Sequence, residues 1–311
     1  MTKQILNPEF RNLIPDLESR GSELEFPPRR MTVPETPPTG RYIYCITDSD
    51  ADESFGPIGM NGTDWVAPGP EAHPAAAAET RVRPEVWSLG FNGIGAVISA
   101  SEVKEHQRNR DSLLAHERAI EAVMKTHTVL PARFSIVAED EAMVRRILTR
   151  EHDRFVELLD GIRGKVEVGL KAIFEETAVC RQILERYSQI REMKARVAKL
   201  PPQRGYAQRI EIGRMVESAL KQEKDAYREE ILNALSPLTL DVRTNGVWND
   251  KMILNAAFLI ERPRAPDFDQ HVEQLAGRYG DRVQFKLVDS VPPFNFVNLA
   301  IDTREYRGVS A

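Results

Sequence analysis

The sequence predicts an α+β protein of two domains that follow an N-terminal arm. Three observations support this fold class. In the first half of the chain, short windows rich in aromatic and β-branched residues alternate with helical repeats of apolar residues. Two long helical stretches come next, and the residues after 235 show a strand, strand, helix and strand order. A chain of 311 residues with 41% hydrophobic content is long enough to form two cores of ordinary size.

The predicted arm comprises residues 1–40. It carries seven prolines and shows little helical or strand periodicity, which favours an extended or disordered segment. Behind its first basic residue, Lys3, there is no apolar segment of the kind that a secretory signal needs. We therefore expect no export by that route and a cytoplasmic location.

The first domain is expected to span residues 41–175. Its helices are predicted at about 111–126 and 140–161, the second capped by Asp140. Its strands are short and rich in β-branched or aromatic residues, or alternate between apolar and polar ones. They are expected at residues 41–47, 94–99, 129–137 and 166–174. Two helices on one antiparallel sheet of about four strands indicate a ferredoxin-like fold or a close variant.

A long insert interrupts this domain at residues 48–83. It is acidic at first and then rich in glycine, proline and alanine. Connections of this length are unusual inside a compact domain. The insert is therefore expected to be either functional or mobile.

The second domain is predicted to begin with a helical hairpin at residues 176–235, broken at Pro201 and Pro202. Each helical stretch carries a narrow apolar stripe, and packing of the two stripes on each other is favoured over a binding groove. Residues 236–311 are expected to form an α+β domain that modifies the ferredoxin-like pattern. Its first two strands flank Asn245 and Gly246, a dipeptide typical of hairpin turns, in a loop of two residues or more.

Composition argues against several classes of partner. With 42 basic and 47 acidic residues, the net charge is −5, so we expect no nucleic acid partner. The two cysteines, Cys45 and Cys180, lie far apart and predict neither a disulfide framework nor a thiolate metal site. The most apolar run, residues 252–260, is less than half the roughly 20 residues that a membrane-spanning helix needs. We therefore expect no membrane insertion.

No catalytic or cofactor motif stands out in the sequence. No two of the six histidines have the four-residue spacing that places metal ligands on one helical face. A glycine-rich segment at residues 90–95 leads into a predicted strand instead of a helix N-terminus, which argues against phosphate binding. We expect no cofactor, no metal and no enzymatic activity.

One candidate polar cluster comprises His116, Glu117 and Arg133. The first two residues fall on the apolar face of their predicted helix, where polar groups are costly unless they are paired. They could form an acid and base pair in a cleft. The favoured interpretation is a satisfied pair at the edge of the core, with Arg133 on the neighbouring strand as its counter-charge.

Several segments, in the same order along the chain, resemble the GvpL/GvpF family of gas vesicle proteins. The C-terminal one, from Pro292 to Val297, is similar to that family's Pro-Pro-aromatic-x-Phe-Val signature. The chain departs from the family pattern at Ser135 and Ile136, and at Val291, which indicates a divergent member. The resemblance covers residues 41–301 and rests on Tyr42-Ile43-Tyr44, residues 95–99, His116 with Glu117, residues 128–134 and residues 292–297.

The resemblance implies a minor, non-enzymatic protein needed for gas vesicle assembly and located at the gas vesicle. It also implies contact with the small hydrophobic shell protein and with other accessory vesicle proteins. A shell subunit is aggregation-prone before it assembles, so a protein that covers its apolar surface or sheet edge would keep it available. The alternative is a ferredoxin-like regulatory module that binds a small ligand.

The segment Pro292, Pro293, Phe294, Asn295 and Phe296 has two interpretations. Two prolines would hold it extended and prevent ladder bonding, so that the aromatic residues brace the C-terminal domain. The same rigid segment could instead present its aromatic residues to a partner. The first interpretation is favoured.

Overall fold

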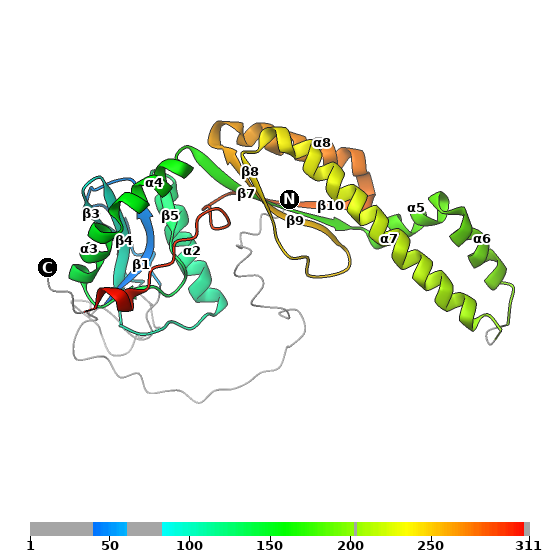
Figure 1. Cartoon of the computed structure of the whole chain (residues 1–311), viewed down its shortest axis with the longest axis horizontal. Coiled ribbons are helices and arrows are strands. Elements are labelled where there is room, and N and C mark those ends of the chain that lie inside the picture. The colour runs from blue at the N-terminus through cyan, green and yellow to red at the C-terminus, as the bar shows by residue number, and fades with distance from the viewer. Residues whose placement is uncertain (1–39, 61–82, 202–203, 308–311) are drawn as a thin grey trace, which may run out of the picture. The chain divides into compact units, whose positions relative to one another are not determined.

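The structure, a computed structural model, describes residues 40–60, 83–201 and 204–307 (Figure 1). The predicted arm, up to residue 39, and residues 61–82 of the insert lie outside the described residues. The chain forms two compact units. Of the described residues, 40–60, 83–164 and 291–307 belong to the N-terminal unit, and those from Lys165 to Ser290 belong to the second unit.

The N-terminal unit is built on a sheet with the strand order β2-β3-β4-β1-β5, and β6 pairs with β1 beyond the end of β5. Turns of different kinds join these strands. Asn92 and Gly93 connect β3 to β4 with φ angles of 47° and 84°, which the Asn-Gly pair adopts readily. Ser135, with a φ angle of 71°, interrupts the strand expected at residues 129–137. The strands are β1 (Gly40–Thr47), β2 (Ser54–Gly56), β3 (Val86–Phe91), β4 (Ile94–Ser101), β5 (Val129–Pro131) and β6 (Val137–Ala138).

Helices cover both faces of this sheet (Figure 1). Because successive residues of a strand point to opposite faces, Tyr42 and Tyr44 of β1 join a core with α2, whereas Ile43 joins a core with α3 and α4. The ferredoxin-like detail is therefore not confirmed. The helices are α2 (Arg110–Met124), α3 (Glu141–Arg150) and α4 (His152–Ile162), so the helix expected at residues 140–161 divides at Glu151.

The predicted cap of this helical region is confirmed. The Asp140 side chain accepts a hydrogen bond from the Met143 amide at 2.7 Å, at the start of α3. Asn109 caps α2 in the same way, accepting from the Ser112 amide at 2.9 Å.

The second unit contains a sheet with the strand order β10-β7-β9-β8. Strand β7, expected in the first sheet, pairs instead with β9 along nine residue positions. An alternating pattern predicts a strand but not its partner, and the long apolar β9 provides the longest ladder. The units therefore divide at residues 164 and 165, not at 175 and 176. The strands are β7 (Lys165–Phe174), β8 (Asp241–Thr244), β9 (Met252–Glu261) and β10 (Val283–Val291).

Four α-helices of the described residues complete the second unit. The predicted hairpin is present, but its first arm divides at Tyr187 into α5 and α6, and both pack on α7. Helices α7 and α8 cover the sheet, and the distal parts of α6 and α7 extend beyond it (Figure 1). The helices are α5 (Glu176–Arg186), α6 (Ser188–Val197), α7 (Tyr206–Leu235) and α8 (Ala265–Tyr279). No helix of the described segments is long and apolar enough to cross a membrane.

Candidate functional site

The segment that carries the Pro-Pro signature begins where β10 ends. Pro292 and Pro293 are buried, and the chain then turns sharply instead of remaining extended. The Val297 amide donates to the Pro293 carbonyl at 2.9 Å, and the Phe294 amide donates to the Pro292 carbonyl at 2.7 Å. The turn directs the residues after it along the N-terminal unit. We call residues 292–307 the C-terminal clasp.

The first half of the clasp packs into the N-terminal unit. Phe294 contacts the core on the α2 side of the sheet, whereas Val297 and Leu299 are buried in the core with α3 and α4. Leu299 also forms a parallel β-bridge with Ala132. The prediction that this segment braces the C-terminal domain is therefore wrong, because its residues pack within the N-terminal unit.

The second half of the clasp ends on α3 and α4. The hydroxyl of the buried Tyr306 donates to the Glu151 carboxylate at 2.9 Å, and the Arg150 guanidinium lies 5.3 Å from the centre of its ring. Burial, followed by the hydrogen bond to Glu151, raises the pKa of Tyr306 to about 12. Arg146 donates to the Tyr306 carbonyl at 3.3 Å. Both ends of the clasp are therefore tied to the same unit.

His116 lies at the centre of a buried relay of hydrogen bonds. Its Nε2 is 3.1 Å from the Ala132 carbonyl, which can only accept, and its Nδ1 is 3.0 Å from the Tyr42 hydroxyl. Burial lowers the pKa of His116 to about 4, so the ring is neutral and its single proton is on Nε2. Tyr42 therefore donates to Nδ1 and accepts from the Ser135 amide at 2.9 Å.

Aromatic rings surround this histidine. The Tyr44 ring stacks on His116 with centroids 5.8 Å apart, and the Phe134 and Tyr42 rings meet it edge-on at 5.7 and 5.6 Å. Tyr44 in turn accepts from the Met60 amide at 2.7 Å and bonds the Ser99 hydroxyl. A neutral, enclosed and fully bonded ring fixes the packing of α2 on β1 and β5.

The predicted polar cluster is only partly assembled. His116 and Glu117 are both buried on α2, as expected. Arg133 is exposed, and its guanidinium donates to the Asn298 side chain in the clasp at 2.7 Å. The expectation that Arg133 supplies the buried counter-charge is therefore wrong. Arg133 lies beyond the end of β5, where strand alternation no longer sets the direction of its side chain, and it binds Asn298 of the clasp instead.

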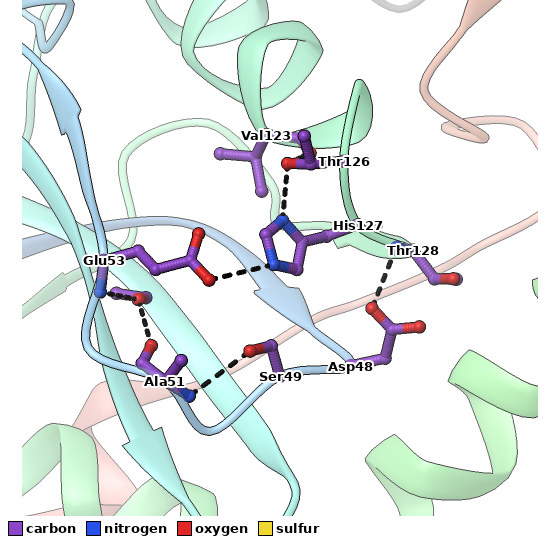
Figure 2. Close-up of polar contacts among 9 residues, drawn as sticks. Asp48, Ser49, Ala51, Glu53, Val123, Thr126, His127 and Thr128 are labelled. Carbon is purple, nitrogen blue, oxygen red and sulfur yellow. Dashed lines mark hydrogen bonds and ion pairs between the residues drawn. The ribbon is translucent and has the colours of Figure 1, made fainter.

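A second polar site, which the sequence did not indicate, joins the acidic loop after β1 to the end of α2 (Figure 2). Thr126 contacts His127 Nδ1 at 2.8 Å, and His127 Nε2 lies 3.5 Å from the Glu53 carboxylate. Asp48 accepts from the Thr128 amide at 2.9 Å. Because the Glu53 side chain is exposed to solvent, its pairing with His127 contributes little, and the hydrogen bonds position the loop.

The acidic residues of this loop do not converge on one point. Asp50 accepts from the Gly93 amide at 3.0 Å, and Asp52 accepts from the Gly90 amide at 3.1 Å. Among the described residues, no three histidine, cysteine or carboxylate side chains are grouped as metal ligands. The carboxylates instead cap the backbone of the β3–β4 turn.

The fold resembles that of two solved gas vesicle proteins. The crystal structure of GvpF from Anabaena sp. PCC7120 is 22% identical, with a TM-score of 0.66 over 85% of this chain and all of that one. The crystal structure of GvpF from Microcystis aeruginosa is 23% identical, with a TM-score of 0.61 over 84% of this chain and all of that one.

Sequence comparisons agree with the structural ones. Gas vesicle protein F from Dolichospermum flosaquae is 26% identical over 65% of this chain and 82% of its own length. Gas vesicle protein L from Streptomyces sp. (strain CB03234) is 30% identical over 61% of this chain and 70% of its own length. The family model for gas vesicle synthesis protein GvpL/GvpF matches residues 40–298. The chain therefore belongs to the GvpL/GvpF family, and its relatives support a gas vesicle accessory role.

Proposed function

We propose that this protein is a non-catalytic assembly factor that binds the small hydrophobic shell protein, together with other accessory proteins, in the cytoplasm and at the growing gas vesicle. Membership of the GvpL/GvpF family is the observation that carries this proposal. A subunit that must line a gas space exposes apolar surface before it is incorporated, and a protein that covers this surface prevents aggregation.

Strand β8 is our candidate for the surface that receives the shell protein. It ends the strand order of the second sheet and pairs with β9 on one side. Exposed edges accept an added strand from a partner, and neighbouring apolar side chains strengthen such pairing. The exposed apolar residues on either side of β8 are Leu240, Val247 and Trp248.

Co-expression with the shell protein tests this proposal. The parent chain should increase the fraction of shell protein that stays soluble and should be recovered in complex with it. Leu240→Asp places a charge beside the sheet edge and should reduce both quantities. Val103→Asp alters an exposed apolar residue of the other unit and serves as the matched control.

Two results would count against the proposal. If the parent chain leaves shell protein solubility unchanged, the binding function is wrong. If both aspartate variants behave like the parent while the complex still forms, the function stands but the assignment to β8 is wrong.

A further inference from the structure

The distal end of the helical hairpin has a charge opposite to that of the rest of the protein. Residues 188–201 and 204–214, which we call the basic tip, contain seven basic and two acidic residues, a net charge of +5. The whole chain carries −5, so the remaining residues carry −10. Local charge of this sign and size attracts acidic groups that the rest of the protein repels.

The basic side chains of the tip are mostly available to a partner. All seven are exposed, on α6, on α7 and in the connection between them. Arg214 lies 3.8 Å from Glu211, an exposed contact of little strength. Within the described part of the chain, no carboxylate forms an ion pair with Lys194, Arg196, Lys199 or Arg204.

Apolar side chains are exposed at the same end of the hairpin. Leu200 is 39% exposed in the connection after α6, and Tyr206 and Ile210 are 69% and 43% exposed in the first turns of α7. Tyr206 and Ile210 are four residues apart and share one helical face with Arg214. The tip therefore offers apolar contact area bordered by positive charge.

A pocket of about 430 Å³ lies nearer the base of the hairpin, between α6 and α7. Ile190, Met215 and Ala219 provide apolar lining, and Arg186 and Gln222 provide polar lining. Its volume is enough for an apolar side chain of a partner. Ile190 belongs to the basic tip, and Met215 directly follows its last residue, Arg214, so the pocket borders the tip.

We infer that the basic tip is a docking site for an acidic amphipathic helix of a second protein. Apolar residues of that helix contact Leu200, Tyr206 and Ile210, and its acidic residues pair with the surrounding arginines and lysines. A nucleic acid duplex presents its phosphates without apolar side chains that could contact Leu200, Tyr206 and Ile210. An amphipathic helix presents acidic and apolar side chains together, which favours a protein partner.

This inference does not depend on the binding of shell protein at β8. It is tested on the full chain with a labelled synthetic 18-residue peptide that carries leucines on one helical face and glutamates on the other. We expect the peptide to bind more weakly at higher salt, and a glutamine version of it to bind at least tenfold more weakly.

Two variants with equal net charge separate position from total charge. The variant with Arg196→Glu, Lys199→Glu and Arg204→Glu reverses three charges in the tip. The control with Arg110→Glu, Arg118→Glu and Lys125→Glu reverses three exposed charges of the N-terminal unit. The tip variant should weaken peptide binding at least tenfold, and the control less than threefold.

Hydrogen exchange locates the contact independently. In the parent chain, the peptide should slow exchange of amides within residues 190–212. Equal weakening in both variants, or no binding by the parent, would overturn the inference. Tighter binding to a DNA duplex or to phosphatidylglycerol vesicles than to the peptide would overturn the choice of a protein partner.

Discussion

Replacing Leu299 with alanine tests whether the C-terminal clasp holds the N-terminal unit together. Leu299 is 1% exposed and lies in the core with α3 and α4, far in sequence from the residues that surround it. Truncation of a fully buried leucine removes its transfer free energy and leaves a cavity, which together cost about 2–5 kcal/mol. The bridge between Leu299 and Ala132 is a backbone contact, so the substitution leaves it available.

Hydrogen exchange resolved by peptide is the appropriate assay, because it reports on each unit separately. For amides of β1 and β4, the loss of about 2–5 kcal/mol in stability should make the opening equilibrium about 30-fold to several thousand-fold more favourable. This range follows from 1.4 kcal/mol per tenfold change in an equilibrium constant. Amides of β7 and β9 should retain their protection.

The matched control is Leu240→Ala, which truncates a leucine that is 51% exposed and should change stability by less than about 1 kcal/mol. If Leu299→Ala leaves β1 and β4 protected, or weakens β7 and β9 instead, the clasp does not stabilise the unit in which it packs.

Further predictions concern the buried relay and the hairpin. Tyr42→Phe removes the hydroxyl that links Ser135 to His116, and urea denaturation should show a loss of about 1–3 kcal/mol; no loss would refute the relay. Because the pKa of His116 falls from 6.5 to about 4 on folding, the unfolded chain binds more protons between these values, and stability should rise with pH across that window by about 3 kcal/mol. His116→Gln should reduce this slope, and an identical slope in parent and variant would contradict the neutral ring. The buried Glu223 carboxylate accepts from Gln182, Arg186 and Tyr187, so Glu223→Gln should cost about 1–3 kcal/mol and speed amide exchange in α5.

Most elements of the fold are predicted by the sequence, but strands β2 and β3 are not. Strand β3, Val86 to Phe91, follows the long insert and ends in the glycine-rich segment at residues 90–95, which hides its strand pattern. The Asn92-Gly93 turn is the feature that defines this hairpin, and the same dipeptide at residues 245 and 246 instead lies in a longer connection between β8 and β9. A turn dipeptide favours a hairpin, but flanking strand register decides whether the tight turn forms.

Long-range pairing could not be predicted from local pattern. The alternation of β7 was visible, but its ladder with β9 depends on residues about 90 positions away. For the same reason, the signature at Pro292 and Pro293 identified the family without indicating that the clasp returns to the N-terminal unit.

For the candidate polar cluster, burial could be predicted from the sequence, but the hydrogen-bond partners could not. Helical spacing correctly predicted that His116 and Glu117 are buried. The partners of these residues could not be predicted in the same way. Tyr42 lies 74 residues from His116 along the chain, and Asn298 lies 165 residues from Arg133. The basic tip, by contrast, is visible in the sequence as a local excess of arginine and lysine, once charge is counted by segment instead of over the whole chain.

Deletion of the gene in its own organism tests the central claim most directly, with buoyancy and electron microscopy of the cells as the measurement. We expect the deletion strain to lack floating cells and mature gas vesicles, and the parent gene supplied in trans to restore both. A deletion strain that floats normally and contains vesicles of normal number and shape would contradict the proposed role in assembly.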